Sequence, residues 1–313
     1  LQSYPQITHM RSHLAAAWKL TTTADLIKKF NFIPSMFDTV ILSITLLWQI
    51  TYLWIDIFDK ETQALRIIRD FGVWLFSGWH ALQVILSILI IAVIYLFFNF
   101  LLKNIFVGGL IHLIRSYFLR QPTQYKWLPA ISRGLKHCLV LIEYQAIFAW
   151  ANVMYILYIF IWWQRFLEGE RWGLVIFVAL TYMIIVAVVA VLFAYTRFFI
   201  VLEKKSLFQA LGASMEMTIT YLDTTLKLFL SLILVYVRLV IVVVAMLILP
   251  SLIGAVIALE LAQIWITLSF VVIWVVYMIF LVIVAHINSI LEIFVETLWF
   301  SFYMENKYLG RDE

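Results

Sequence analysis

The sequence contains one cysteine, few charged residues and none of the short motifs that mark common catalytic sites. A single thiol, Cys138, excludes a disulfide within the chain and leaves the redox compartment undefined. A G-x-x-x-x-G-K-[ST] phosphate loop, an H-E-x-x-H metal pair and a G-x-S-x-G nucleophile turn are all missing from the 313 residues. The six histidines are scattered over several segments. We therefore expect no enzymatic activity, no metal and no cofactor.

Charge is scarce because the chain is unusually apolar. Charged residues make up 13% of the sequence and hydrophobic residues 65%, whereas a soluble domain has about 25% and about 45–50% respectively. The net charge of +4 is too small to indicate nucleic-acid binding. This composition predicts an integral membrane protein, whose partners are membrane lipids and another membrane protein or complex.

Six apolar runs are long enough to cross a bilayer, since a spanning α-helix needs about 20 apolar residues. Their length argues against a β-barrel, whose strands alternate in polarity over about ten residues. We predict an all-α polytopic membrane protein with about six transmembrane helices and amphipathic helices at the interfaces. The expected spans are residues 37–58, 81–102, 138–163, 172–201, 226–249 and 264–286.

The basic residues that flank these runs predict the orientation of the chain, because cytoplasmic loops carry an excess of lysine and arginine. The N-terminus, the 103–137 and 197–227 loops and the C-terminus hold sixteen of the 22 basic residues. We therefore expect both termini to be cytoplasmic. The opposite side holds five, namely Lys60, Arg66, Arg69, Arg165 and Arg171.

Four stretches have the amphipathic pattern of helices that lie at a membrane surface. The first, residues 13–30, is expected to stop before the NFIP sequence that ends at Pro34. The others are residues 61–79, 105–120 and 206–222. The chain is accordingly expected to divide into an interfacial N-terminal segment, a transmembrane domain and a cytoplasmic tail, at residues 1–36, 37–302 and 303–313.

A weak internal repeat relates two parts of the chain. The order of span, cytoplasmic amphipathic helix and span occurs at 81–163 and again at 172–249. Such repeats are common among membrane folds. At an offset of 80 residues, the matching pairs are Ala130 with Ala210, Leu135 with Met215, and Glu143 with Asp223.

Arg238 is the most unusual residue of the sequence, because it interrupts the apolar stretch from 228 to 259. Helical rise from the preceding lysine places it about 16 Å deep. An arginine near the bilayer midplane costs at least about 2.5–3.5 kcal/mol unless it finds a partner. Glu143 is the expected partner, and Glu292 and Glu296 are the alternatives. A pair that registers two helices, a polar cavity for a headgroup or ion, and a contact with another chain all remain open.

Two stretches carry a recurring pattern of small and apolar residues. Residues 108–142, GGLIHLIRSYFLRQPTQYKWLPAISRGLKHCLVLI, contain a glycine pair at an apolar helix end, a short loop, and a helix that opens with small residues. Residues 198–229, FFIVLEKKSLFQALGASMEMTITYLDTTLKLF, contain a V-x-E-x-x-S and A-L-x-x-S pattern on Val201, Glu203, Ser206, Ala210, Leu211 and Ser214. Both stretches resemble the hallmarks of YciC-type (UPF0259-like) bacterial inner-membrane proteins.

The membrane domain of some glycerophosphoryl diester phosphodiesterases is similar to the same part of the chain, roughly residues 80–300. The resemblance implies a six-helix bundle of the bacterial inner (plasma) membrane that has no assigned chemistry. The phosphodiesterase version implies a membrane module that serves a catalytic partner. No catalytic residue carries over to this sequence.

Three functions are compatible with such a chain. A non-enzymatic scaffold or accessory subunit that binds lipid or another membrane protein accounts best for the missing motifs and the amphipathic segments. A small transporter or channel would need a hydrated path, for which the polar residues around Arg238 and Glu143 are few. A lipid-processing enzyme ranks last. We predict the scaffold, with the transporter or channel as its alternative.

Overall fold

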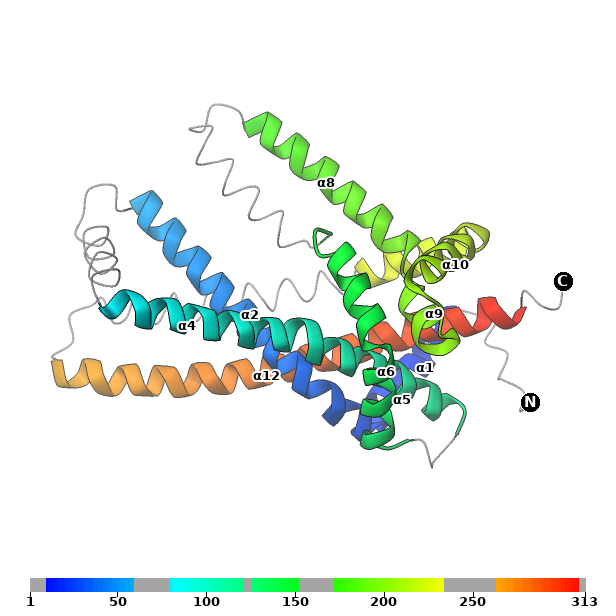
Figure 1. Cartoon of the computed structure of the whole chain (residues 1–313), viewed down its shortest axis with the longest axis horizontal. Helices are drawn as coiled ribbons and strands as arrows, with labels where there is room; N and C mark the ends of the chain where they lie inside the picture. The colour runs from blue at the N-terminus through cyan, green and yellow to red at the C-terminus, as the bar shows by residue number, and fades with distance from the viewer. Residues whose placement is uncertain (1–9, 59–78, 121–124, 152–171, 234–262, 310–313) are drawn as a thin grey trace. The chain divides into compact units, whose positions relative to one another are not determined.

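The structure is a computed structural model that describes residues 10–58, 79–120, 125–151, 172–233 and 263–309 (Figure 1). Every regular element in these ranges is helical, which confirms the all-α class for this part of the chain. The elements are, in order, α1 (Met10–Thr23), α2 (Asp25–Phe58), α4 (Trp79–Leu96), the π-helix η1 (Phe97–Leu102), α5 (Lys103–Phe118), α6 (Trp127–Ile147), α8 (Trp172–Leu192), α9 (Thr196–Glu203), α10 (Leu207–Thr220) and α12 (Gln263–Leu309).

Among the described residues, three helical stretches are long and apolar enough to cross a membrane. Ile85–Phe118 joins α4, η1 and α5, Gly173–Glu203 joins α8 and α9, and Val275–Lys307 lies within α12. Large apolar side chains are exposed along α4, α8 and the first half of α12. A surface of this kind is typical of helices that face lipid or a membrane partner. These findings identify an integral membrane protein with three candidate spans.

The remaining expected spans are described only in part. Residues 37–58 are helical as part of α2. The expected spans at 138–163 and 226–249 both extend into residues outside the described ranges, and so does the amphipathic segment expected at 61–79.

Contacts divide the chain into two compact units. Unit 1 comprises Leu1–Phe30, Asn104–Tyr236 and Leu291–Glu313, and unit 2 comprises Asn31–Lys103 and Val237–Ile290. The boundaries expected near residues 36 and 302 fall inside helices α2 and α12, which run through these positions without a break.

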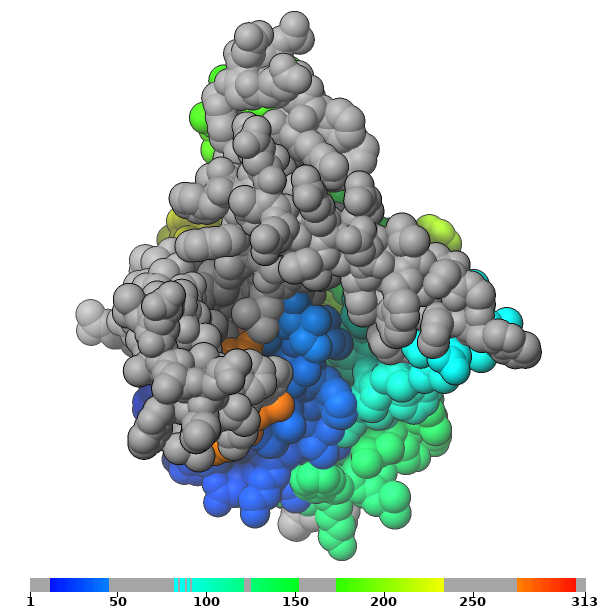
Figure 2. Space-filling model, turned by 90° about the vertical axis from the view of Figure 1, so that its left-hand side faces the viewer, coloured from blue at the N-terminus to red at the C-terminus, as the bar shows by residue number. Residues whose placement is uncertain are grey.

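In unit 2, α2 and α12 lie side by side, as the blue and orange atoms of Figure 2 show. The Asn31 amide donates a hydrogen bond to the carbonyl of Ser289 at 3.3 Å. The Tyr277 hydroxyl donates to the hydroxyl of Ser43 at 3.1 Å. Each bond satisfies a polar group on a largely apolar helix surface, so these contacts fix the register of the two helices.

Unit 1 contains most of the buried core. Helix α5 is buried along most of its length. Helix α6 approaches it closely at Gly108 and Gly134, and Phe300 of α12 packs against Phe118. The Phe198 ring lies 5.4 Å from the Tyr303 ring, and the Tyr195 ring lies 5.4 Å from Trp299. The largest fully buried side chains include Tyr195, Tyr303, Phe30, Phe198 and Phe300.

The N-terminal helices differ from the expectation. Helix α1 ends at Thr23, and α2 then continues from Asp25 through Pro34, whereas the sequence suggested a stop before NFIP. A proline removes one backbone hydrogen bond and kinks a helix without having to end it. Pro34 is buried, so packing holds the helix together on both sides of it. Ala17 and Leu20 are fully buried, so the apolar face of α1 packs against protein.

Helices α6 and α10 repeat one pattern at the offset of 80 residues. Each pair matched in the sequence also agrees in burial: Ala130 and Ala210 are buried, and Leu135, Met215, Glu143 and Asp223 are exposed. At the same offset, Gly134 and Ser214 each lie against an earlier helix, α5 and α8 respectively. A Cβ on Gly134 would lie 2.0 Å from the carbonyl oxygen of Ile105, and the Ser214 hydroxyl donates to the carbonyl of Leu192 at 3.0 Å.

Candidate functional site

A buried ion pair joins α9 to α12 in unit 1. Nη2 of Arg197 lies 3.1 Å from Oε2 of Glu296. The side chain of Glu296 is 4% exposed and that of Arg197 is 32% exposed. A carboxylate that deeply buried needs a paired charge, because the cost of removing it from water is otherwise large. The pair therefore fastens two of the candidate spans to each other.

The carboxylate of Glu203, the last residue of α9, has three donor groups around it. It accepts a hydrogen bond from the Tyr303 hydroxyl at 2.5 Å and another from the Lys307 ammonium group. The ammonium of Lys205 lies 3.2 Å away and 4.5 Å from the centre of the Phe199 ring. The glutamate of the V-x-E-x-x-S pattern thus holds the end of α9 against α12.

His13 fastens α1 to the same part of α12. Its Nε2 lies 2.5 Å from Oε2 of Glu305, and its Nδ1 lies 3.0 Å from the hydroxyl of Ser301. The imidazole stacks on the Phe302 ring at a centroid distance of 4.2 Å. Helices α1 and α9 therefore both attach to α12 through polar contacts.

Four buried polar atoms near the ends of these helices have no hydrogen-bond partner among the described residues. They are Oε1 of Glu296, Oγ1 of Thr196, Oγ1 of Thr297 and Nδ2 of Asn306. Thr196 and Thr297 are the sequence neighbours of Arg197 and Glu296. A buried polar group without a partner costs about 1–3 kcal/mol. This region of unit 1 consequently retains unused hydrogen-bonding capacity.

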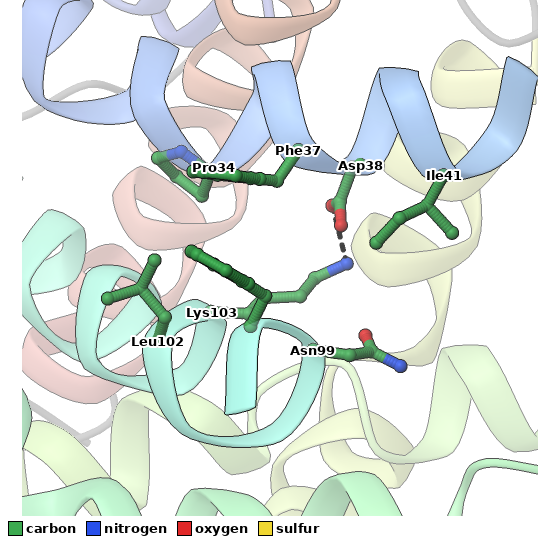
Figure 3. Close-up of a pocket in the computed structure, with 8 residues that line it drawn as sticks. Pro34, Phe37, Asp38, Ile41, Asn99, Leu102 and Lys103 are labelled. Carbon is green, nitrogen blue, oxygen red and sulfur yellow. Dashed lines mark hydrogen bonds and ion pairs between the residues drawn. The ribbon is translucent and has the colours of Figure 1, made fainter. Parts of the chain in front are cut away.

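A small polar cleft lies in unit 2 between α2 and the junction of η1 with α5 (Figure 3). Asp38 on α2 and Lys103 at the start of α5 form an ion pair of 2.6 Å. The rings of Phe37 and Phe98 stack beside it, with centroids 4.1 Å apart. The cleft has room for about one water molecule, far less than the about 300–1,000 Å³ typical of ligand pockets. We therefore assign no ligand to it.

The π-helix η1 positions the lysine of this cleft. The backbone N–H of Lys103 bonds to the carbonyl of Phe98, five residues earlier. A π-turn shifts every following side chain around the helix axis relative to an uninterrupted α-helix. Figure 3 shows Lys103 reaching from this turn toward Asp38. The charges of Lys103 and Asp38 therefore neutralise each other within the protein.

Three of the four residues expected to form a site lie in the described chain. Glu296 is the buried partner of Arg197. Glu292 lies one turn earlier on α12 and is close enough to act on Glu296 electrostatically. Glu143 is exposed on α6. Arg238 lies outside the described residues, so its pairing with Glu143 stays a prediction.

The sequence did not single out Arg197 or Lys307, and it marked Glu203 only as part of the V-x-E-x-x-S pattern, without its partners. Each lies at the end of an apolar run, where a charged residue is typical of a solvated loop. One signal was present, because Tyr303 and Lys307 are four residues apart and share one helix face. Their partner, Glu203, is 100 residues from Tyr303 in sequence, and a single sequence does not reveal contacts over that separation.

Metal-ligating residues do not gather in the described ranges: no group of three or more His, Cys, Asp or Glu side chains there is placed to hold a metal ion. The buried histidines have protein neighbours. His13 contacts Glu305, and Nδ1 of His112 accepts a hydrogen bond from the guanidinium of Arg133 at 3.1 Å.

The fold and the site define an α-helical membrane protein in which buried ion pairs fasten the ends of candidate spans. Comparison of the chain with protein-family models, curated proteins and solved structures gave no match. The resemblance to YciC-type proteins and to the membrane domain of the phosphodiesterases therefore stays a prediction.

Proposed function

We propose that this chain is a non-enzymatic integral membrane protein that serves as a scaffold or accessory subunit and binds lipid or another membrane protein. The observation that carries the proposal is the use of charge in unit 1. Arg197 with Glu296, and Glu203 with Lys307, form ion pairs that hold α9 on α12. Charged groups engaged in this way stabilise a helix arrangement. A reaction centre would need them available to a substrate.

We also propose a six-span topology with both termini in the cytoplasm and, from the family resemblance, a place in the bacterial inner membrane. The distribution of basic residues, sixteen on one side and five on the other, supports the orientation. Exposed apolar side chains on α4, α8 and α12 support contact with lipid or with a second membrane protein.

Extraction of the full chain from its native membrane tests the proposed function. The chain would be extracted with a polymer that retains the surrounding lipid. The proteins and lipids that co-purify with it would be identified by mass spectrometry. We expect a partner protein in fixed ratio, a defined lipid class, or both. A chain that emerges without a partner, in lipid of the bulk membrane composition, would contradict the proposal.

A small transporter or channel is the second candidate function. One observation favours it: Glu296 lies within the candidate span Val275–Lys307 and keeps one carboxylate oxygen without a partner among the described residues. Ion flux into liposomes that contain the purified chain tests this candidate. Flux that disappears in Glu296→Gln would favour transport, and the absence of flux from the unmodified chain would remove it.

A further inference from the structure

A basic surface in unit 1 includes two lysines, Lys136 and Lys204, that take no part in the contacts described so far. It consists of Arg133, Lys136 and His137 on α6 and Lys204 in the turn between α9 and α10. Helix α6 packs against both α9 and α10 (Figure 1). Burial lowers the pKa of His137, and Lys204, Lys136 and Arg133 lower this pKa further through their positive charge. The three basic side chains are therefore all within electrostatic reach of His137.

The uncompensated positive charge of this surface lies on its two lysines, whereas Arg133 is hydrogen-bonded to His112. Lys136 and Lys204 are exposed, and no carboxylate of a described residue lies within ion-pair distance of either. Glu203 directly precedes Lys204, but its carboxylate is occupied by donors from Tyr303, Lys205 and Lys307. Uncompensated lysines at neighbouring positions attract an anion.

The backbone holds Lys204 in one place. Lys204 has a left-handed conformation, with φ of 56°, at the end of α9. The following residue, Lys205, donates its backbone N–H to the carbonyl of Phe199 at 3.3 Å. Ser206 caps α10 and donates its own N–H to the side chain of Gln209 at 3.3 Å. Glycine fits a left-handed helix end better than lysine does, so the lysine contributes a charge at a position that backbone geometry does not require.

Large apolar side chains surround these charges. Leu135 and Leu139 on α6 are 58% and 74% exposed, and Phe208 on α10 is 79% exposed. Basic and apolar side chains on one surface are typical of helices that enter the headgroup region of a bilayer. Isolated basic residues on a water-exposed helix would lack these apolar neighbours.

The position of Lys204 after a candidate span agrees with the depth of lipid phosphates in a bilayer. The candidate span Gly173–Glu203 has 31 residues, so its helical rise is at most about 46 Å. The hydrocarbon core is about 30 Å thick, and the bilayer with its headgroups is about 40–45 Å thick. Helix α8 alone has 21 residues, so its rise of about 31 Å is enough to cross the hydrocarbon. A turn at residues 193–195 separates it from α9, so Lys204 follows after the apolar helix has ended, where the headgroups are expected.

We infer that the basic surface of Arg133, Lys136, His137 and Lys204 binds the phosphate groups of anionic phospholipids, with the acyl chains against Leu135, Leu139 and Phe208. The inference rests on the proposed function and deepens it, because it names anionic lipid as the ligand of this surface. Ammonium and guanidinium groups form strong, charge-assisted hydrogen bonds with phosphate oxygens. Helix α6 belongs to the first copy of the repeated pattern and the α9–α10 turn to the second, so both copies contribute.

Native mass spectrometry of the full chain in neutral detergent tests this inference. The chain would be mixed with equal amounts of phosphatidylglycerol and phosphatidylcholine of identical acyl chains. We expect preferential retention of phosphatidylglycerol. The double variant Lys136→Gln with Lys204→Gln should lose about fivefold of that preference per lysine at low ionic strength. The charge-conserving variant Lys136→Arg with Lys204→Arg should keep it.

A matched control removes the same charge elsewhere. Lys19→Gln with Lys29→Gln changes two exposed lysines on other segments and should retain the preference. Equal loss in both double variants would overturn the local site, because net charge alone would then explain binding. Unchanged preference in the Lys136 and Lys204 variant would also overturn it. Inorganic phosphate at millimolar concentration should not displace the lipid, and displacement would indicate a site for free anions.

The two proposals fail in distinguishable ways. A chain that co-purifies with lipid or a partner, but whose lipid preference ignores Lys136 and Lys204, would leave the proposed function standing without this site. An acidic protein segment that competes with phosphatidylglycerol for the surface would replace lipid as the occupant and overturn the inference. Thermal unfolding of each variant checks that the fold is intact.

Discussion

The guanidinium of Arg197 lies 3.1 Å from the carboxylate of Glu296, although the two residues belong to helices far apart in the sequence. Glu296 is almost completely buried and Arg197 is partly exposed. The pair therefore joins α9, the last part of one candidate span, to the packed half of another.

Removal of one member of this pair should destabilise the protein more than removal of both. Arg197→Met leaves a buried carboxylate without its partner, which typically costs about 3–5 kcal/mol. Glu296→Gln leaves a partly exposed guanidinium, so its cost should be smaller. The double variant should cost less than the sum of the two. Thermal unfolding of the three variants in detergent measures this coupling, and strict additivity would show that the pair contributes no interaction energy.

The close approach of α6 to α5 at Gly134 should tolerate no side chain. A Cβ there would lie 2.0 Å from the carbonyl oxygen of Ile105, so Gly134→Ala must push the helices apart at a cost of about 1–3 kcal/mol. Gly212 on α10 has nothing within 4 Å of an added Cβ, so Gly212→Ala should be neutral or stabilise by up to about 1 kcal/mol. Thermal-shift measurements compare the two, and equal effects would refute the close contact.

The fold class was predictable from the sequence because a helix needs only an apolar run of sufficient length. Helix ends were less predictable, since Pro34 signals a stop that the buried packing of α2 overrides. The repeat at offset 80 was visible in three pairs, and the agreement of their burial gives that pattern a structural meaning. The contacts of Glu203 and Arg197 were not predictable, because they depend on packing between distant segments.

Acidification should weaken the fold through His137. Burial and the charges of Lys204, Lys136 and Arg133 hold the pKa of His137 below its ordinary value. Above about pH 6.5 the imidazole is neutral in both the folded and the unfolded chain. As the pH falls further, the unfolded chain binds the proton first, so stability decreases until the pH passes the lowered pKa of the folded state.

Thermal unfolding between pH 8 and pH 5 measures this dependence. His137→Gln should reduce the loss of stability on acidification and change little at pH 8. Bound phosphatidylglycerol should also reduce the loss of stability on acidification, because a phosphate beside His137 favours the protonated imidazole. A His137→Gln profile that matches the unmodified chain would refute the role of this residue.

Arg238 should pair with an acidic side chain inside the helix bundle, and Glu143 is the expected partner. Glu296 already has a partner in Arg197, which makes Glu143 the stronger of the alternatives. Arg238→Met and Glu143→Gln should each destabilise the protein, and their combination should cost less than the sum. Additive effects in thermal unfolding would exclude this pairing and direct the search to Glu292.

Site-directed labelling measures most directly whether the chain is a polytopic membrane protein whose basic surface faces the cytoplasm. In a Cys138→Ala background, single cysteines would replace Lys126, which is exposed at the start of α6, and Arg165, which lies in an expected outer loop. A membrane-impermeant thiol reagent added to intact cells should label the cysteine at 165 and spare the one at 126. Inverted vesicles should show the opposite pattern, and labelling of both positions from the same side would contradict the topology.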